Sequence, residues 1–211
     1  MLFKSLLAGL LALSTLAPAL ADNAPRQTQP AASPEAVSPL LNGMAVPAIE
    51  VQNSDGDAVS LNGLLQGKRS LVLFYRGGWC PYCNAQLAGL QEIEKELAEL
   101  NIQVLALAPE PPEKLKEGEG KGNYTLLSDR NLEASYGFGL AYTLDKGTSG
   151  KYKARFGADR MKQDAQKLVV LPAPAAYLVD EKGLVQFSYV NPNYRVRVSP
   201  QLLLTAAQLM E

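Results

Sequence analysis

The chain has 211 residues, and its 20 Lys and Arg nearly balance its 21 Asp and Glu. The sequence contains neither a basic cluster that would suggest nucleic-acid binding nor an acidic tail that would suggest a charged partner. The chain has two cysteines and no histidine, which argues against a zinc site because zinc needs about four Cys, His or carboxylate ligands. We expect no metal, flavin or nucleotide cofactor.

The N-terminus predicts an export signal in residues 1–21. Lys4 supplies the positive charge, and residues 6–17 form an apolar run that is shorter than the ~20 residues a membrane-spanning helix needs. Ala19 and Ala21 are small residues at the two cleavage-site positions. We expect cleavage after Ala21, an extracytoplasmic location such as the periplasm, and no membrane attachment of the mature chain. An uncleaved membrane anchor is the alternative.

Residues 22–40 are rich in Ala, Pro, Gln and Ser, a composition typical of a flexible linker. One domain is expected in residues 41–211, a length sufficient to bury a core. Its first elements are predicted to be two strands at 47–53 and 58–61, joined into a hairpin by the turn at Asp55-Gly56.

The middle of the chain predicts a strand–helix–strand unit. Residues 70–75 form a continuous apolar run, as in a strand buried on both faces. Residues 81–100 carry apolar side chains every three or four positions, which predicts an amphipathic helix. A strand at 102–107 would complete a right-handed parallel crossover. Shorter elements are expected to follow, namely a helix at 111–116, a strand at 124–127 and a helix at 131–136.

The last third of the chain alternates between weak and strong patterns. Residues 143–167 are polar and basic, and predict only a loop with some helix. Strands are expected at 175–179 and 184–190 as a second hairpin, followed by a helix that Ser199 caps and that ends near Met210. The whole pattern predicts an α/β fold with a mixed central sheet flanked by helices.

The chemistry is concentrated in Cys80-Pro81-Tyr82-Cys83, at the start of the predicted long helix. The free N–H groups and dipole of a helix N-terminus stabilise a thiolate, so Cys80 is the expected nucleophile. Cys83 lies on the same helix face and can resolve a mixed disulfide at Cys80. A purely structural disulfide between these two cysteines would contribute little to stability. Closing a loop this short stabilises the fold by only ~2 kcal/mol, against about 4.7 kcal/mol for a 100-residue loop. The pair itself is then the redox cofactor.

Several side chains near the cysteine pair have more than one possible role. Pro81 suits the first helical position because it has no N–H to leave unpaired. Trp79 either shields the cysteines and forms a substrate surface or packs on the fold. Arg76 either lowers the pKa of Cys80 through its charge or is a salt-bridged or solvated loop residue. Glu110, after the third strand, is a candidate proton acceptor for Cys83.

Residues 74–84 (FYRGGWCPYCN) resemble the thioredoxin-fold redoxins of the alkyl hydroperoxide reductase/thiol-specific antioxidant (AhpC/TSA, peroxiredoxin-like) family. The resemblance implies a thioredoxin-like fold. Tyr194, Arg195 and Arg197 also match the family, and we assign them no chemical role. The other matching segments are 43–48, 126–130, 134–137 and 189–197.

The resemblance bears on the reaction at two positions. Peroxiredoxins carry a Thr-x-x-Cys motif, which places Cys83 where the peroxidatic cysteine would be and Cys80 where the Thr would be. They also carry an Arg before the strand that enters the site, and Pro174 occupies that position here. In thioredoxins this residue is a cis-proline facing the cysteines, so the resemblance implies a cis bond between Ala173 and Pro174. The alternatives are an ordinary trans proline before a strand, and Pro172 as the cis-proline.

We therefore expect an exported thiol-disulfide oxidoreductase that exchanges electrons with a thiol protein or a small thiol. The alternative is a peroxiredoxin-like thiol peroxidase that reduces hydroperoxides, with Cys83 or Cys80 as the peroxidatic cysteine. A third reading is a redox-sensing or binding module without turnover. Tyr82 lies within the motif and is expected to support the site in either enzyme.

Overall fold

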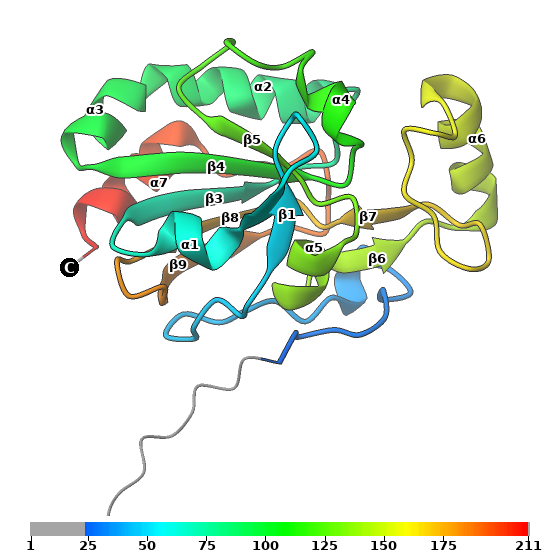
Figure 1. The fold of residues 1–211 in the computed structure, drawn as a ribbon, viewed down its shortest axis with the longest axis horizontal. Coiled ribbons are helices and arrows are strands. Elements are labelled where there is room, and N and C mark those ends of the chain that lie inside the picture. The colour runs from blue at the N-terminus through cyan, green and yellow to red at the C-terminus, as the bar shows by residue number, and fades with distance from the viewer. Residues whose placement is uncertain (1–23, 211) are drawn as a thin grey trace, which may run out of the picture.

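The computed structural model describes residues 24–210 and is built on one mixed sheet (Figure 1). The seven strands lie in the order β2-β1-β5-β4-β3-β8-β9, and a second, two-stranded sheet pairs β6 with β7. The strands are β1 (Glu50–Gln52), β2 (Ala58–Ser60), β3 (Arg69–Phe74), β4 (Ile102–Ala108), β5 (Thr125–Ser128), β6 (Ala141–Thr143), β7 (Val170–Pro172), β8 (Ala175–Val179) and β9 (Val185–Val190).

Helices cover both faces of the large sheet (Figure 1). They are η1 (Pro34–Ala36), α1 (Leu61–Leu65), α2 (Pro81–Gly89), η2 (Leu90–Glu92), α3 (Glu94–Glu99), α4 (Pro112–Leu115), α5 (Glu133–Gly137), α6 (Lys146–Phe156) and α7 (Pro200–Gln208). This confirms the predicted α/β class, with a mixed central sheet flanked by helices. No helix in residues 24–210 is long and apolar enough to cross a membrane.

Strand β3 lies inside the sheet and directs the chain to the cysteine motif. It pairs in parallel with β4, as the predicted crossover requires, and antiparallel with β8. Val72 and Phe74 point into one core layer, with α1 and α5, whereas Leu71 and Leu73 point into the other, with α2, α3 and α7. Burial on both faces explains the continuous apolar run.

The helix predicted over 81–100 is present but interrupted. It consists of α2, the 3₁₀ turn η2 and α3, with a non-helical residue at Ile93. Gly89, which weakens a helix, lies at the break, where a Cβ would approach Pro200 Cγ to 3.3 Å. Leu90, Ile93 and Leu97 all stay buried, so the tighter turn keeps the apolar stripe against the sheet.

The described part of the predicted linker contacts the domain. The N–H of Ala31 donates to the carbonyl of Ala141 at 2.8 Å, and the N–H of Thr143 donates to the carbonyl of Ala31 at 2.9 Å. Leu40 is buried. Backbone pairing with β6 and a few apolar side chains thus hold a segment whose composition suggested a free linker. The predicted signal peptide, residues 1–21, lies outside the described residues.

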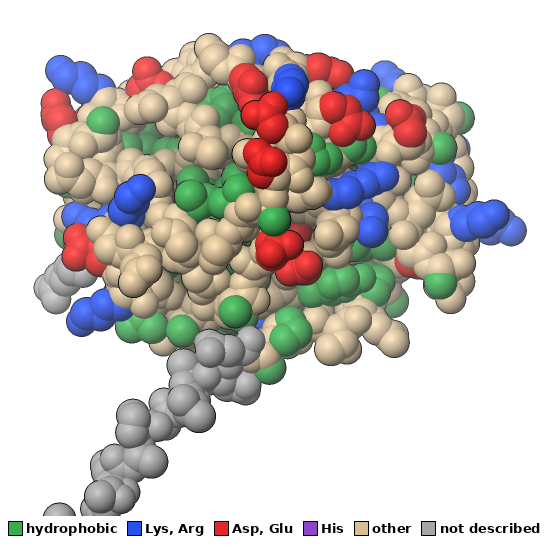
Figure 2. Space-filling model, viewed as in Figure 1, with side chains coloured by type: hydrophobic (Ala, Val, Ile, Leu, Met, Phe, Trp, Pro, Cys, Tyr) green, Lys and Arg blue, Asp and Glu red, His purple; other side chains and the backbone are tan. Residues whose placement is uncertain are grey.

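Residues 143–167 contain more order than their sequence pattern indicated. Helix α6 begins where the Asp145 side chain accepts the N–H of Thr148 at 2.9 Å. Figure 1 shows α6 beside β6 and β7, at one end of the large sheet. Its Tyr152 and Phe156 pack against Trp79 and against the edge of one core layer, and most of its other side chains are polar or small, so no regular apolar stripe marks it in the sequence. Acidic and basic side chains are interspersed on the face shown in Figure 2.

The two hairpins and the last helix are confirmed. Strand β1 pairs antiparallel with β2, and β8 with β9. The Ser199 side chain accepts the N–H of Leu202 at 3.2 Å, and Pro200 is the first residue of α7.

The prediction of a cis bond before Pro174 is wrong, because no peptide bond among the described residues is cis. Pro174 lies in the short connection between β7 and β8. The N–H of Ala173 donates to Leu140 at 2.8 Å and the carbonyl of Pro174 accepts from Asn191 at 3.2 Å, so the backbone on both sides of the bond is paired. Pro174 is an ordinary trans proline before a strand.

Candidate active site

The two cysteines lie at the junction between the end of β3 and the start of α2. Gly77 makes the turn after the strand, at a φ of +136°, where a Cβ would come within 2.8 Å of the Glu110 carboxyl carbon. Cys80 is the N-cap of α2 and Pro81 its first residue, so the predicted placement is confirmed. Both thiols are free, and the exposed fractions of Cys80 and Cys83 are 1% and 0%.

The surroundings of the cysteines make their acidities unequal. The pKa of Cys80 is lowered to about 6, chiefly by a hydrogen bond from Cys83 and then by the charges of Arg76 and Arg197, which together outweigh burial. Burial, followed by the interaction with Cys80, raises the pKa of Cys83 well above its usual value. The reduced pair therefore holds one thiolate, on Cys80, and one thiol, on Cys83.

Two N–H donors point at the second cysteine. The backbone N–H of Arg76 lies 3.4 Å from Cys83 Sγ, and Arg197 Nη2 lies 3.5 Å from the same atom. These contacts favour negative charge on Cys83 Sγ whenever this sulfur leaves from a disulfide.

Arg76 is buried, with an exposed fraction of 2%, and no carboxylate pairs with it among residues 24–210. Its Nη2 donates to the Tyr152 hydroxyl at 2.8 Å, and its guanidinium carbon lies 4.1 Å from the centre of the Tyr194 ring. The alternative of a salt-bridged or solvated loop residue is therefore wrong. Aromatic rings and the Cys80 thiolate hold this cation in place.

Trp79 is half-buried and lies under α6. Its ring centre is 4.6 Å from that of Phe156 and 5.5 Å from that of Tyr152. The Arg76 guanidinium lies 5.2 Å from the Trp79 ring. Trp79 thus packs on the fold and also helps to enclose the arginine beside the cysteines. Tyr82 remains exposed, with its ring 5.8 Å from that of Tyr194.

Three residues of the site were not assigned a role from the sequence. Arg197 and Tyr194 come from the segment after β9, and Tyr152 comes from α6. The match of residues 189–197 to the redoxin family was the available signal for the first two. No sequence signal pointed to Tyr152, because the local pattern around it is polar.

Pro174 occupies the position where the family carries an arginine, yet the site has two arginines. Ala175 pairs with Phe74, so Pro174 lies beside the end of β3. Guanidinium groups reach the cysteines from Arg76, directly after β3, and from Arg197, after β9. Cationic support for a thiolate is therefore present, from other segments of the chain.

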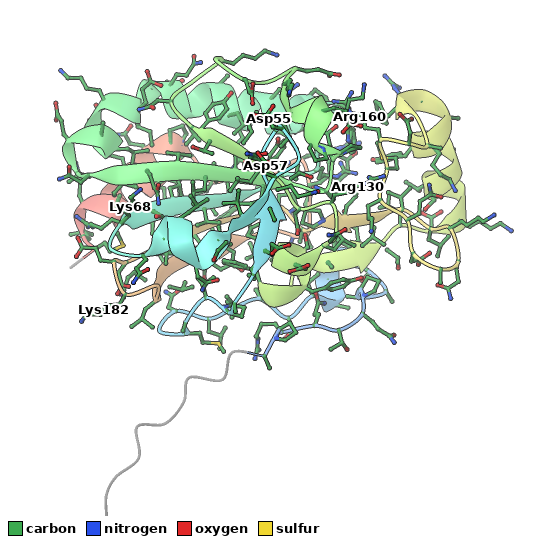
Figure 3. All side chains as sticks on the ribbon, in the orientation of Figure 1. Asp55, Asp57, Lys68, Arg130, Arg160 and Lys182 are labelled. Carbon is green, nitrogen blue, oxygen red and sulfur yellow. The ribbon has the colours of Figure 1, made fainter. Side chains whose placement is uncertain are left out.

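Glu110 fixes the loop before the motif. Its exposed fraction is 1%, and one carboxylate oxygen accepts the N–H of Gly78 at 2.6 Å. The other oxygen is paired with Arg160, which also reaches Glu117 at 3.1 Å; Figure 3 shows Arg160 between α4 and α6. Burial raises the pKa of Glu110, and Arg160 opposes that rise. With these partners Glu110 positions the loop, and a role as proton acceptor for Cys83 gains no support.

Replacing Glu110 by Gln is expected to destabilise the reduced protein by about 2–3 kcal/mol, since it leaves Arg160 without its buried partner. Urea unfolding measures the change. Glu117→Gln is the matched control, because Glu117 is the exposed partner of the same arginine and its loss should cost less than about 0.5 kcal/mol. Equal losses in the two variants would contradict the anchoring role of Glu110.

Tyr152→Phe is expected to cost about 1–3 kcal/mol, because the buried Arg76 Nη2 loses its hydrogen-bond acceptor. Thermal unfolding of the reduced protein measures the loss. Tyr124→Phe serves as a control on a half-buried tyrosine away from Arg76. If both variants unfold at the wild-type temperature, the bond between α6 and Arg76 contributes nothing to stability.

Among residues 24–210, no group of three or more Cys, Asp or Glu side chains is arranged to hold a metal ion. A thioredoxin-like sheet with a Cys-x-x-Cys pair at a helix N-terminus, and a Cys80 thiolate favoured by hydrogen bonding from Cys83 and by two arginines, defines a thiol-based oxidoreductase.

The comparisons identify the family. The family model described as the AhpC/TSA family matches residues 43–188, and the chain belongs to this family. Peroxiredoxin Bcp of Escherichia coli (strain K12) is 35% identical over 106 residues, which cover 49% of this chain and 67% of the relative. Peroxiredoxin Q, chloroplastic, of Oryza sativa subsp. japonica is 25% identical over 154 residues, which cover 72% of this chain and 60% of the relative.

Solved structures share the fold at low identity. Peroxidoxin BcpB from Mycobacterium tuberculosis superposes with a TM-score of 0.61 at 19% identity, covering 81% of this chain and 97% of its own. Reduced Prx3 from Vibrio vulnificus superposes with a TM-score of 0.64 at 16% identity, covering 80% of this chain and 99% of its own. These structures confirm the predicted thioredoxin-like fold.

Proposed function

We propose that the protein is a thiol peroxidase, in which the Cys80–Cys83 dithiol reduces a hydroperoxide and a thiol donor then reduces the disulfide. The observation that carries the proposal is the burial of both sulfurs, with exposed fractions of 1% and 0%. A small hydroperoxide needs only a narrow opening to reach a buried sulfur, whereas a polypeptide disulfide would require a larger movement of the covering side chains. The relatives named peroxiredoxins support the same reaction.

The proposed oxidation has two steps. The Cys80 thiolate attacks one peroxide oxygen, the O–O bond breaks, and the alkoxide or hydroxide leaves with a proton from solvent. Cys80 is then a sulfenic acid. The Cys83 thiol attacks this sulfur, a water molecule leaves, and the Cys80–Cys83 disulfide forms. The lowered pKa of Cys80, about 6, supplies the thiolate at neutral pH.

The roles of the two cysteines have a specific alternative. The family pattern places Cys83 at the peroxidatic position, and Cys83 Sγ is the atom that both Arg76 N–H and Arg197 Nη2 approach. We assign the first attack to Cys80 because its pKa is lowered while that of Cys83 is raised.

Dithiol–disulfide exchange, the reaction that the motif itself favours, becomes the second half of the same cycle. A small thiol, or a thiol protein once the covering side chains have moved, must reduce the Cys80–Cys83 disulfide after each peroxide is consumed. Two departures from the family favour exchange alone, namely Cys80 in place of the Thr and Pro174 in place of the arginine. Arg76 and Arg197 answer the second departure, because they supply positive charge at the cysteines from other segments.

The test compares two turnover assays on the full chain. We expect steady consumption of hydrogen peroxide with a dithiol donor, and much slower reduction of the disulfides of insulin. Insulin reduction without peroxide consumption would overturn the proposal in favour of an exchange enzyme. Trp79 is the single tryptophan, so its fluorescence can report oxidation or reduction of the cysteine pair. If this fluorescence changes with redox state but neither assay shows turnover, the protein is a sensor.

We also propose that the mature protein acts outside the cytoplasm, in the periplasm or an equivalent compartment, with the cysteine pair as its sole cofactor. The basis is the pattern of residues 1–21, which ends in Ala19-Leu20-Ala21. Cell fractionation followed by N-terminal sequencing tests this. We expect a mature chain that starts at Asp22 in the extracytoplasmic fraction, and full-length chain in the cytosol would contradict it.

A further inference from the structure

A cavity of about 320 Å³ lies beside the redox motif, between α2 and the segment that leads from β9 into α7. Tyr82 and Ala85 line it from α2, and Leu203 lines it from α7. Arg195 and Arg197 line the side between the two helices. We call this cavity the Arg195–Arg197 pocket.

The pocket is positively charged and lacks a counter-charge. No Asp or Glu lines it, and neither arginine pairs with a carboxylate in the described part of the chain. Arg197 Nη1 donates to the carbonyls of Tyr194 and Val196, while its Nε is buried and has no hydrogen-bond partner. Pro200, at the rim, begins α7, whose N-terminal end adds positive potential. These features suit a carboxylate, which accepts hydrogen bonds from guanidinium groups.

The same arginine links the pocket to the redox pair. Arg197 Nη2 lies 3.5 Å from Cys83 Sγ, and Tyr82 stands between the two cysteines in the sequence. The remaining wall includes Val198 and Leu203, so the pocket has an apolar part next to its charged end. A short aliphatic chain that ends in a carboxylate would place its other end near the cysteines.

We propose that the Arg195–Arg197 pocket binds the carboxylate of the small thiol that reduces the Cys80–Cys83 disulfide. This inference rests on the proposed function, which produces that disulfide in every cycle. It assigns the reductant to one chemical class, a low-molecular-weight thiol carrying a carboxylate.

The reaction needs two equivalents of thiol. The first thiolate attacks Cys80 Sγ, the S–S bond breaks, and Cys83 leaves with the electron pair beside Arg197 Nη2 and the N–H of Arg76 before it takes up a proton. A second thiolate attacks the sulfur of the bound thiol in the mixed disulfide. Cys80 then leaves as a thiolate, and the two thiols depart as a disulfide, having supplied both electrons.

The test uses protein oxidised with diamide, so that no peroxide is involved. Trp79 fluorescence follows reduction by 3-mercaptopropionate, which is anionic, and by 2-mercaptoethanol, which is neutral, with rates expressed per thiolate. We expect wild-type protein to prefer 3-mercaptopropionate. Arg195→Gln should lower that preference by about threefold to fivefold, the value of an exposed ion pair. Ala85→Glu, which adds a competing carboxylate to the pocket, should lower it further.

Arg155→Gln is the control, because Arg155 is an exposed arginine on α6 that does not line the pocket. An equal drop in preference in this variant would overturn the inference in favour of general electrostatic attraction. No preference in wild-type protein would overturn it too. The inference would also be overturned if the protein preferred a carboxylate only in the oxidation step. In that case it would react faster with a carboxylated hydroperoxide than with tert-butyl hydroperoxide, but would show no preference between the two thiols. A thiol preference that persists in a protein without peroxide turnover would refute only the proposed function.

Discussion

The Cys80→Ser variant is expected to lose peroxide turnover by at least about 10³-fold, because a serine hydroxyl is not ionised at neutral pH and is a weak nucleophile. The Cys83→Ser variant should lose turnover as well, but for a different reason. Its Cys80 thiolate can still react once with peroxide, and the resulting sulfenic acid has no partner thiol. The two variants thus separate the first chemical step from the second.

A single-turnover experiment distinguishes them. Protein is mixed with one equivalent of peroxide, Trp79 fluorescence follows the reaction, and a sulfenic-acid reagent traps the product for mass spectrometry. We expect trapped sulfenic acid at Cys80 in Cys83→Ser and none in Cys80→Ser. The reverse pattern, with sulfenic acid at Cys83, would assign the first attack to the residue that the family pattern favours.

Cationic support for the cysteines comes from two distant segments. Arg76 follows β3 directly, and Arg197 arrives after β9. Both lower the pKa of Cys80, and neither has a carboxylate partner among the described residues. A buried guanidinium without a carboxylate is costly unless another anion is near. The Cys80 thiolate is that anion, so the fold and the redox state of the pair are energetically linked.

Much of the fold follows from local sequence patterns. The apolar run of β3, the stripe of α2 and α3, and the turn at Asp55-Gly56 can each be recognised within a short window of sequence, so pattern and structure agree. The same patterns place Cys80 at a helix N-terminus. The break at Gly89 depends on α7 packing nearby, and no local pattern reports that contact.

The parts of the site that were missed depend on contacts between distant residues. Helix α6 turns Tyr152 and Phe156 toward Trp79, more than 70 positions earlier in the chain, so its local composition suggests a solvated segment. Arg197 reaches Cys83 across 114 positions. The cis-proline expectation failed for another reason: it was carried over by resemblance, and the backbone around Pro174 pairs in the trans form.

Replacing Arg76 by Met is expected to raise the pKa of Cys80, because it removes one of the two positive charges that hold the thiolate. Loss of an adjacent opposite charge typically shifts a pKa by ~1–3 units. With a starting pKa of about 6, the thiolate fraction and the rate of peroxide attack at pH 7 should fall by about twofold for a shift of one unit and by about tenfold for a shift of two units. The rate should recover at alkaline pH, where Cys80 ionises without help.

Thiolate absorbance, titrated in reduced wild-type, Arg76→Met and Arg76→Lys proteins, measures the shift. Lys keeps the charge and should restore most of the acidity, whereas Arg155→Gln should leave the titration unchanged. An Arg76→Met titration identical to wild type would show that Arg197 and the hydrogen bond from Cys83 suffice.

The same shift predicts how stability depends on pH. Because folding lowers the pKa of Cys80 from an ordinary 9.0 to about 6, the thiolate stabilises the reduced fold fully above pH 9.0, and this contribution is lost as the pH falls toward about 6. Arg76→Met should flatten that dependence, since its Cys80 titrates nearer to the unfolded value. Urea unfolding across this range tests the link. We expect the free energy of unfolding to rise more with pH in the reduced wild-type protein than in Cys80→Ser. If the two proteins show the same pH dependence, the thiolate is not the counter-ion of Arg76.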